Sequence, residues 1–153
     1  MHRARDGGEG YARRLHKGQL SVAGVPVGRL LEPPPAGREA PGGSCIVVVA
    51  TDASLGTHQL TRLARRAALG LGRSGSIGHH GSGEIFVAFS TGDGDDVHDR
   101  DLNRFFGAVV DATEESVLNS LWAAEDVEGR EGRVIRALPH EPVLELLRAA
   151  GRI

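Results

Sequence analysis

Residues 41–52 read PGGSCIVVVATD. The start of this stretch is typical of an exposed segment, and the residues that follow directly are typical of a buried one. Residues 33–43 are rich in proline and glycine, which predicts a linker or exposed loop because neither residue suits a helix or a central strand. The β-branched run that follows predicts a strand over Cys45–Thr51 that is covered on both faces and lies inside the protein. The single hydroxyl of Ser44 therefore stands where a mobile loop meets a fixed strand.

The next two segments extend this strand into a layered fold. From Thr57 to Leu71, leucine and alanine recur at helical spacing while arginines occupy the other side, which predicts a helix packed on the sheet. Within Glu84–Thr91, apolar residues occupy the positions that would face either side of a strand. This pattern predicts a second strand covered on both faces.

The remainder of the chain continues the alternation of strands and helices. A wide apolar face predicts a helix over Leu102–Ala124, with an interruption near Thr113. A short strand is expected over Arg133–Ala137, followed by a last helix that Pro142 opens and Gly151 closes. This order predicts an α/β or α+β fold.

The amino-terminal part has a different character. Met1–Gly18 lacks helical or strand periodicity and is expected to be a poorly ordered leader. Gln19–Leu31 has spaced apolar residues broken by Gly24 and Pro26, which predicts short strand pieces around a turn.

The composition indicates which kinds of binding partner and which cellular compartment to expect. The 153 residues carry 18 Lys and Arg against 20 Asp and Glu, a formal charge of -2, so nucleic acid and anionic lipid are not expected partners. Cys45 is the only cysteine and is expected to be a small core residue, which suits a cytoplasmic location. The sequence has no apolar run of the length that a bilayer-spanning helix needs, so no membrane association is expected.

The Gly43-Ser44 junction is suited to self-cleavage. Gly43 has no side chain to hinder attack on its carbonyl, so the Ser44 hydroxyl could take that carbonyl in an N-to-O acyl shift. Water would then free a new α-amine, whose reference pKa of about 7.7–8.0 allows it to act as a general base near neutral pH. The Gly-Ser pair taken alone is a weak signal, because such a pair before a strand is more often a simple turn.

Two other candidate sites fail on context. The glycine-rich segment Gly70–Gly83 lacks the ending of a phosphate-binding loop and leads into a strand instead of a helix. His79 and His80 are adjacent and have no further ligand at useful spacing, so no metal site is expected. The sequence indicates no cofactor.

Several motifs in one register resemble the DmpA-type L-aminopeptidase/D-esterase and β-peptidyl aminopeptidase family. They include Gly43-Ser44 with the strand after it, and the glycine-rich segment with the strand from Glu84. Further matching motifs are HQL at 58–60, ALGL at 68–71, ATEE at 112–115, LN at 118–119 and ALPH at 137–140.

The resemblance implies a precursor that is cut before Ser44 into two subunits, which stay together in a four-layer αββα sandwich. Ser44 falls on the nucleophile position, and Ser82 and Glu84 fall on the serine and acidic residue that support it. The family's oxyanion-stabilising asparagine belongs to the larger subunit, and Arg13 stands near the corresponding position here. The fold is therefore expected to be incomplete at its amino terminus.

These observations predict a self-processing serine aminopeptidase that releases amino-terminal residues from short peptides, amides or esters through an acyl-enzyme on Ser44. Residues 19–43 would be a remnant of the larger subunit with the cleavage linker, and residues 44–153 the smaller catalytic subunit. The expected partner is a larger subunit of the same family or a second copy. The related ornithine acetyltransferases use threonine, so serine favours hydrolysis over acyl transfer. The alternative is a truncated, non-catalytic paralogue that serves only as a folded or partner-binding domain.

Overall fold

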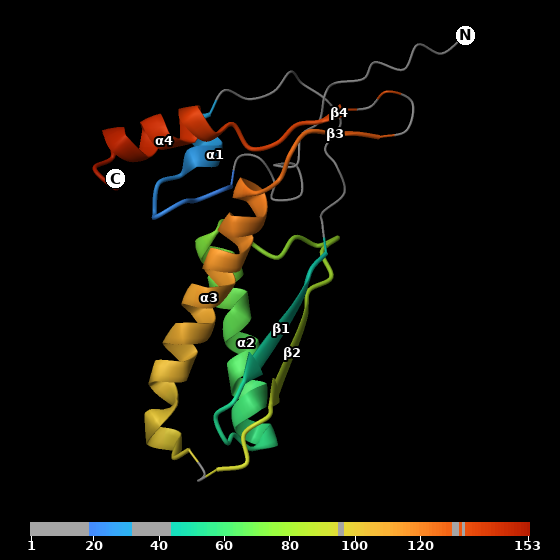
Figure 1. The fold of residues 1–153 in the computed structure, drawn as a ribbon, viewed down its shortest axis with the longest axis vertical. Coiled ribbons are helices and arrows are strands. Elements are labelled where there is room, and N and C mark those ends of the chain that lie inside the picture. Colours follow the sequence, from blue (N-terminus) through green and yellow to red (C-terminus); the bar gives the residue numbers. More distant parts are fainter. Residues whose placement is uncertain (1–18, 32–43, 95–96, 130–131, 133) are drawn as a thin grey trace.

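The computed structural model describes residues 19–31, 44–94, 97–129, 132 and 134–153 (Figure 1). In chain order the elements are α1 (Val27–Leu30), β1 (Ile46–Thr51), α2 (Thr57–Arg73), β2 (Ile85–Ser90), the 3-10 helix η2 (Asp99–Asp101), α3 (Leu102–Trp122), β3 (Val127–Glu128), β4 (Val134–Ile135) and α4 (His140–Ala149). The leader predicted for residues 1–18 and the whole linker predicted for residues 33–43 lie outside the described residues.

Strands β1 and β2 form a parallel pair in which Ile46 lies opposite Ile85 and Thr51 opposite Ser90. Helix α2 connects them and contacts both, and α3 runs beside α2 (Figure 1). Parallel strands joined by a helix confirm the α/β prediction, and the described residues place helices on one face of this β1–β2 sheet.

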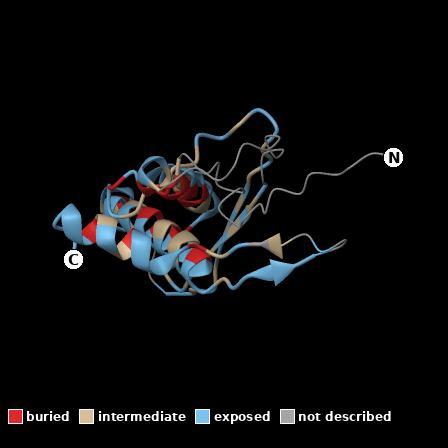
Figure 2. Cartoon of the chain, turned by 90° about the horizontal axis from the view of Figure 1, so that it is seen from above, coloured by how far each residue is buried: buried red, intermediate tan, exposed pale blue. Residues whose placement is uncertain are grey.

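The apolar residues divide into two cores. One lies between the sheet, α2 and α3 and has as its buried members Leu55, Leu63, Ala67, Leu102 and Val109. The other lies at the far end of α3 and has as its buried members Leu20, Val25, Val27, Leu121, Leu138, Val143 and Leu147. Figure 2 shows buried residues in red mainly along the helices, and no described residue of β1 or β2 is fully buried.

The prediction that both strands are covered on both faces is wrong for this chain. Along β1 and β2 exposure alternates residue by residue, so that one face contacts the helices and the other is open. The open face carries five apolar side chains that are between 45% and 68% exposed: Ile46, Val48, Ile85, Val87 and Phe89. The apolar pattern was identified correctly, but the described residues provide a helical layer for only one side.

The segment before α1 also differs from its prediction. The expected strand pieces reduce to one antiparallel bridge between Val22 and Val25, closed by a turn in which Ala23 and Gly24 have φ values of 49° and 77°. One helical turn, α1, then follows Pro26. The apolar side chains of this segment enter the second core with α4, so they do not extend a sheet.

Helix α3 is continuous through Thr113, where an interruption was expected. The Thr113 hydroxyl donates to the Val109 carbonyl at 2.7 Å, which satisfies this buried polar group within the helix. In the last part of the chain the predicted strand is shorter than expected and pairs with β3, which was not predicted.

Helix α4 begins at His140, two residues before the Pro142 that was expected to open it. It closes at Gly151 as predicted. Gly151 has a φ of 65°, and the Gly151 and Arg152 amides donate to the Arg148 and Leu147 carbonyls, the pattern of a Schellman cap.

Replacing Gly70 by alanine is expected to destabilise the fold by about 1–3 kcal/mol through overpacking. A Cβ at Gly70 would lie 2.5 Å from the Val110 carbonyl oxygen and 2.6 Å from Thr113 Cβ, because α2 and α3 approach closely there. The matched control is Gly72→Ala in the same helix, where a Cβ meets no atom within 4 Å. That change should be neutral or stabilising by up to about 1 kcal/mol. Urea unfolding of both variants checks this prediction, and an equal effect at the two positions would contradict it.

Candidate active site

The amino ends of β1 and β2 lie side by side because the two strands are parallel and in register. The Ile85 amide donates to the Cys45 carbonyl at 3.0 Å, so pairing begins just before both strands. Continuing the same register by two residues puts Ser44 opposite Gly83. The residues that precede the two strands therefore meet at one edge of the sheet.

Ser44 is exposed at this edge, as a nucleophile that meets substrate needs to be. Exposure alternates residue by residue here, so Ser44 lies on the same open face of the sheet as the exposed Ile46, and Cys45 lies on the other face. Its Oγ accepts a hydrogen bond of 3.1 Å from the Gly83 amide. The hydroxyl is thus oriented by a backbone group of the neighbouring loop.

Ser82 and Glu84 flank Gly83 and are bonded to each other. The Ser82 hydroxyl donates to the Glu84 Oε1, and both residues are half-buried. The Ser82 amide donates to the His79 carbonyl at 2.8 Å, which fixes the loop immediately before the pair. A half-buried carboxylate at this position can hold a cationic group or orient a hydroxyl.

Cys45 adjoins Ser44 and needs to be considered as a competing nucleophile. Burial raises the pKa of the Cys45 thiol, and the negative charge of Glu84 raises it further. The thiolate is the reactive form of cysteine, so this thiol is less reactive at neutral pH than an ordinary one. Ser44 is the better candidate.

The structure brings all three residues predicted from the sequence, Ser44, Ser82 and Glu84, to the same edge of the sheet. The sequence reasoning missed the Gly83 amide, which is the group that contacts Ser44 Oγ. The signal was present in the sequence, because aligning the two apolar strands at Ile46 and Ile85 pairs residue 44 with residue 83.

The loop that carries these residues is anchored to the segment upstream of Ser44. The Ser21 amide donates to the Ser74 carbonyl at 3.1 Å, and Gln19 Oε1 lies 2.9 Å from His79 Nε2. Gly75 has a φ of 106°, and a Cβ there would lie 1.7 Å from the Gln19 carbonyl oxygen. Residues 19–21 thus pack closely against the loop that leads to the site.

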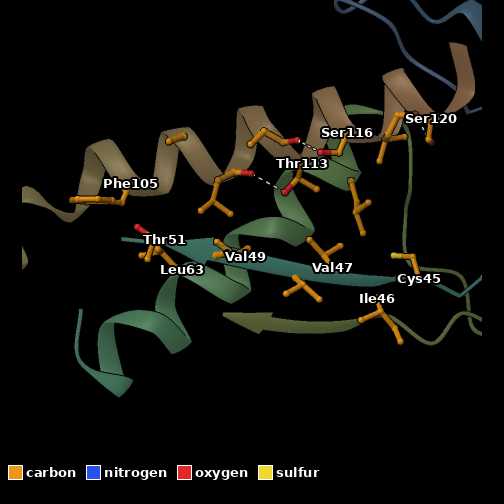
Figure 3. Close-up of a pocket in the computed structure, with 17 residues that line it drawn as sticks. Cys45, Ile46, Val47, Val49, Thr51, Leu63, Phe105, Thr113, Ser116 and Ser120 are labelled. Atoms are coloured by element: carbon orange, nitrogen blue, oxygen red, sulfur yellow. Dashed lines mark hydrogen bonds between the residues drawn. The ribbon is translucent and has the colours of Figure 1, made fainter. Parts of the chain in front are cut away.

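A pocket of about 530 Å³ lies next to this edge, between β1 and α3 (Figure 3). Its walls are mostly apolar, and side chains of β1 such as Val47 and Val49 face α3 across it. Cys45 lines its end, but Ser44 does not line it. The polar groups that can do chemistry lie at the strand ends, so we place the candidate site there and not in the pocket.

Within the described ranges, no three or more His, Cys, Asp or Glu side chains are grouped as metal ligands would be. No helix in that part of the chain has both the length and the apolar character needed to cross a membrane. Arg13, which was expected near the position of an oxyanion donor, lies outside the described residues.

Comparison with known proteins relates the chain to one family. The model of peptidase family S58 matches residues 11–135. The chain is 41% identical over 160 residues to the beta-peptidyl aminopeptidase BapA of Sphingosinicella microcystinivorans, a match that covers 88% of this chain and 40% of that protein. The chain thus spans about two fifths of the length of the curated relatives that it matches.

Solved structures agree with this result. The chain is similar to the L-aminopeptidase D-Ala-esterase/amidase of Ochrobactrum anthropi, with a TM-score of 0.78 and 39% identity over 89% of this chain and 41% of that one. That protein is a prototype for the serine aminopeptidases and a new variant of the Ntn hydrolase fold. The PH0078 protein of Pyrococcus horikoshii OT3 is similar with a TM-score of 0.80 and 39% identity, over 89% of this chain and 40% of that one.

Proposed function

The chain belongs to peptidase family S58, and from this premise we propose that it is the catalytic part of a self-processing serine aminopeptidase. Its substrates would be short peptides, amides or esters with a free amino terminus. The single observation that carries the proposal is the position of Ser44 Oγ, exposed at the sheet edge beside the Gly83 amide, which the bonded Ser82–Glu84 pair flanks in the sequence.

The first step of the proposed chemistry is the cut itself. The Ser44 Oγ attacks the Gly43 carbonyl, and the peptide bond is replaced by an ester while the nitrogen becomes a free amine. Water then hydrolyses the ester, which leaves Gly43 with a carboxylate and Ser44 as an amino terminus.

In the proposed turnover, the new α-amine accepts the proton of the Ser44 hydroxyl as Oγ attacks the substrate carbonyl. The same proton passes to the leaving amine, and water hydrolyses the resulting ester. The Glu84 carboxylate is proposed to hold the ammonium group of the substrate, with Ser82 fixing the orientation of that carboxylate. This pairing would restrict the enzyme to substrates with a free amine.

The open face of the sheet supports a proposal about the partner. Five neighbouring apolar side chains at that face are exposed, which is unusual for a surface that meets water only. We propose that the larger subunit of the complete enzyme covers this face and completes the four-layer sandwich. The length of the curated relatives, of which this chain spans about two fifths, is consistent with such a subunit.

The proposed division at Ser44 makes residues 19–43 part of the upstream piece and residues 44–153 the catalytic piece. Leu20, Val25 and Val27 lie in a core with α4, so the upstream piece should stay bound after the cut. A cytoplasmic location is part of the same proposal, on the basis of the single cysteine.

Hydrolysis assays with matched substrates test this function. We expect an aminoacyl amide with a free α-amine to be hydrolysed at least about 10-fold faster than its N-acetylated counterpart, because acetylation removes the charge that Glu84 would bind. A panel of L-, D- and β-aminoacyl amides would define the preference. Equal rates for free and acetylated substrates would contradict an aminopeptidase.

A further inference from the structure

The Gly83 amide is the hydrogen-bond donor that the structure directs at Ser44 Oγ, at a distance of 3.1 Å. The groups on both sides of it are fixed. Before it, the Ser82 amide is bonded to the His79 carbonyl at 2.8 Å, and after it the Ile85 amide is bonded to the Cys45 carbonyl at 3.0 Å. The direction of the Gly83 N–H is therefore set by the strand pairing and by the loop.

Gly83 also leaves little space for a side chain. A Cβ at this position would lie 3.2 Å from Ser44 Oγ and 3.8 Å from Ser44 Cβ. Gly83 is not among the glycines with positive φ, so its backbone does not by itself require glycine. A side chain at residue 83 would instead have to displace Ser44 Oγ by a few tenths of an ångström.

We propose that the Gly83 N–H is a catalytic group that stabilises negative charge on Ser44 Oγ, an inference that rests on the proposed function. The charge develops when the hydroxyl proton moves to the Ser44 α-amine and Oγ forms its bond to the substrate carbonyl carbon. It develops again when water has attacked the ester, the carbon–Oγ bond breaks and its electron pair returns to Oγ. A fixed N–H at this point needs no reorganisation in either step.

The direct test removes the N–H without adding an atom, by replacing residue 83 with glycolic acid so that the amide becomes an ester. A hydrogen bond to a charged oxygen contributes enough that we expect kcat for an aminoacyl amide to fall about 10- to 100-fold, with KM little changed. The same replacement at Gly81, an exposed residue of the same loop, is the control and should leave kcat within about twofold.

A second pair of variants tests the close contact. Gly83→Ala should slow hydrolysis by about 10-fold or more, since its Cβ displaces Oγ, whereas Gly81→Ala should not. Both should unfold at the same urea concentration as the unchanged protein, which separates an effect on the reaction from an effect on folding.

Nuclear magnetic resonance measures the hydrogen bond independently of activity. In protein labelled with ¹⁵N-glycine, Ser44→Ala should shift the Gly83 amide proton signal and leave that of Gly81 unchanged. An unshifted Gly83 signal, or an active enzyme whose kcat survives the ester replacement at residue 83, would overturn this inference while leaving the proposed function intact. An unchanged protein that hydrolyses no aminoacyl amide when the proposed larger subunit is present would instead contradict the proposed function, and this inference with it.

Discussion

Replacing Ser44 by alanine is expected to lower kcat for aminoacyl amide hydrolysis by about 10³-fold or more. The change removes the oxygen that forms the acyl-enzyme, and removing the nucleophile is among the most damaging changes to an enzyme of this mechanism. The residual rate would come from substrate binding and remaining polar groups alone. Initial rates measured at saturating substrate check the prediction.

Cys45→Ala is the matched control, because it removes the other nucleophilic atom at the same strand end. The raised pKa of the Cys45 thiol predicts that this variant keeps its activity within a few-fold of the unchanged protein. If Cys45→Ala were inactive and Ser44→Ala active, the assignment of the nucleophile would be wrong.

Glu84→Gln is expected to lower kcat/KM by about 10²-fold for substrates with a free α-amine. Glutamine keeps the shape of the side chain and can still accept a hydrogen bond from Ser82, but it lacks the negative charge proposed to bind the substrate ammonium. The loss should be much smaller for N-acetylated substrates, so the preference for free amines should narrow. Rates for both substrates, measured with both proteins, give this comparison.

Glu145→Gln provides the control for loss of a negative charge, since Glu145 is an exposed residue of α4 outside the site. It should leave kcat/KM unchanged. An equal effect of Glu84→Gln on free and acetylated substrates would argue that Glu84 does not bind the amine.

The elements next to the site could be predicted closely from the sequence. The apolar β-branched run and the leucine–alanine spacing placed β1 and the start of α2 within one residue of their observed positions. These signals are local, because each depends on residues within one strand or one helix. The glycine at 151 was equally informative about the end of α4.

Features that depend on distant contacts could not be predicted in the same way. The apolar pattern of β1 and β2 shows that both faces suit burial, but not that the described residues cover only one. Val25 and Val27 are of a residue type that is common in strands. Both pack instead in the core that α4 completes, and the Val27 backbone is helical. Tertiary packing decided the outcome in both places.

The candidate site also combines features that could be predicted from local sequence with one that depends on a distant contact. Sequence motifs predicted Ser44, Ser82 and Glu84 as site residues, while the contact to Ser44 Oγ is made by a backbone amide, which the motifs do not indicate. Only the register between two strands 39 residues apart brings that amide to the hydroxyl.

The intact mass of the purified protein tests most directly whether Ser44 cuts the chain. We predict two pieces, one that ends at Gly43 and one that begins at Ser44, with a combined mass one water greater than the precursor. Ser44→Ala should give a single uncut species. A wild-type chain that stays whole, or that is cut at another bond, would contradict the account and favour the non-catalytic alternative.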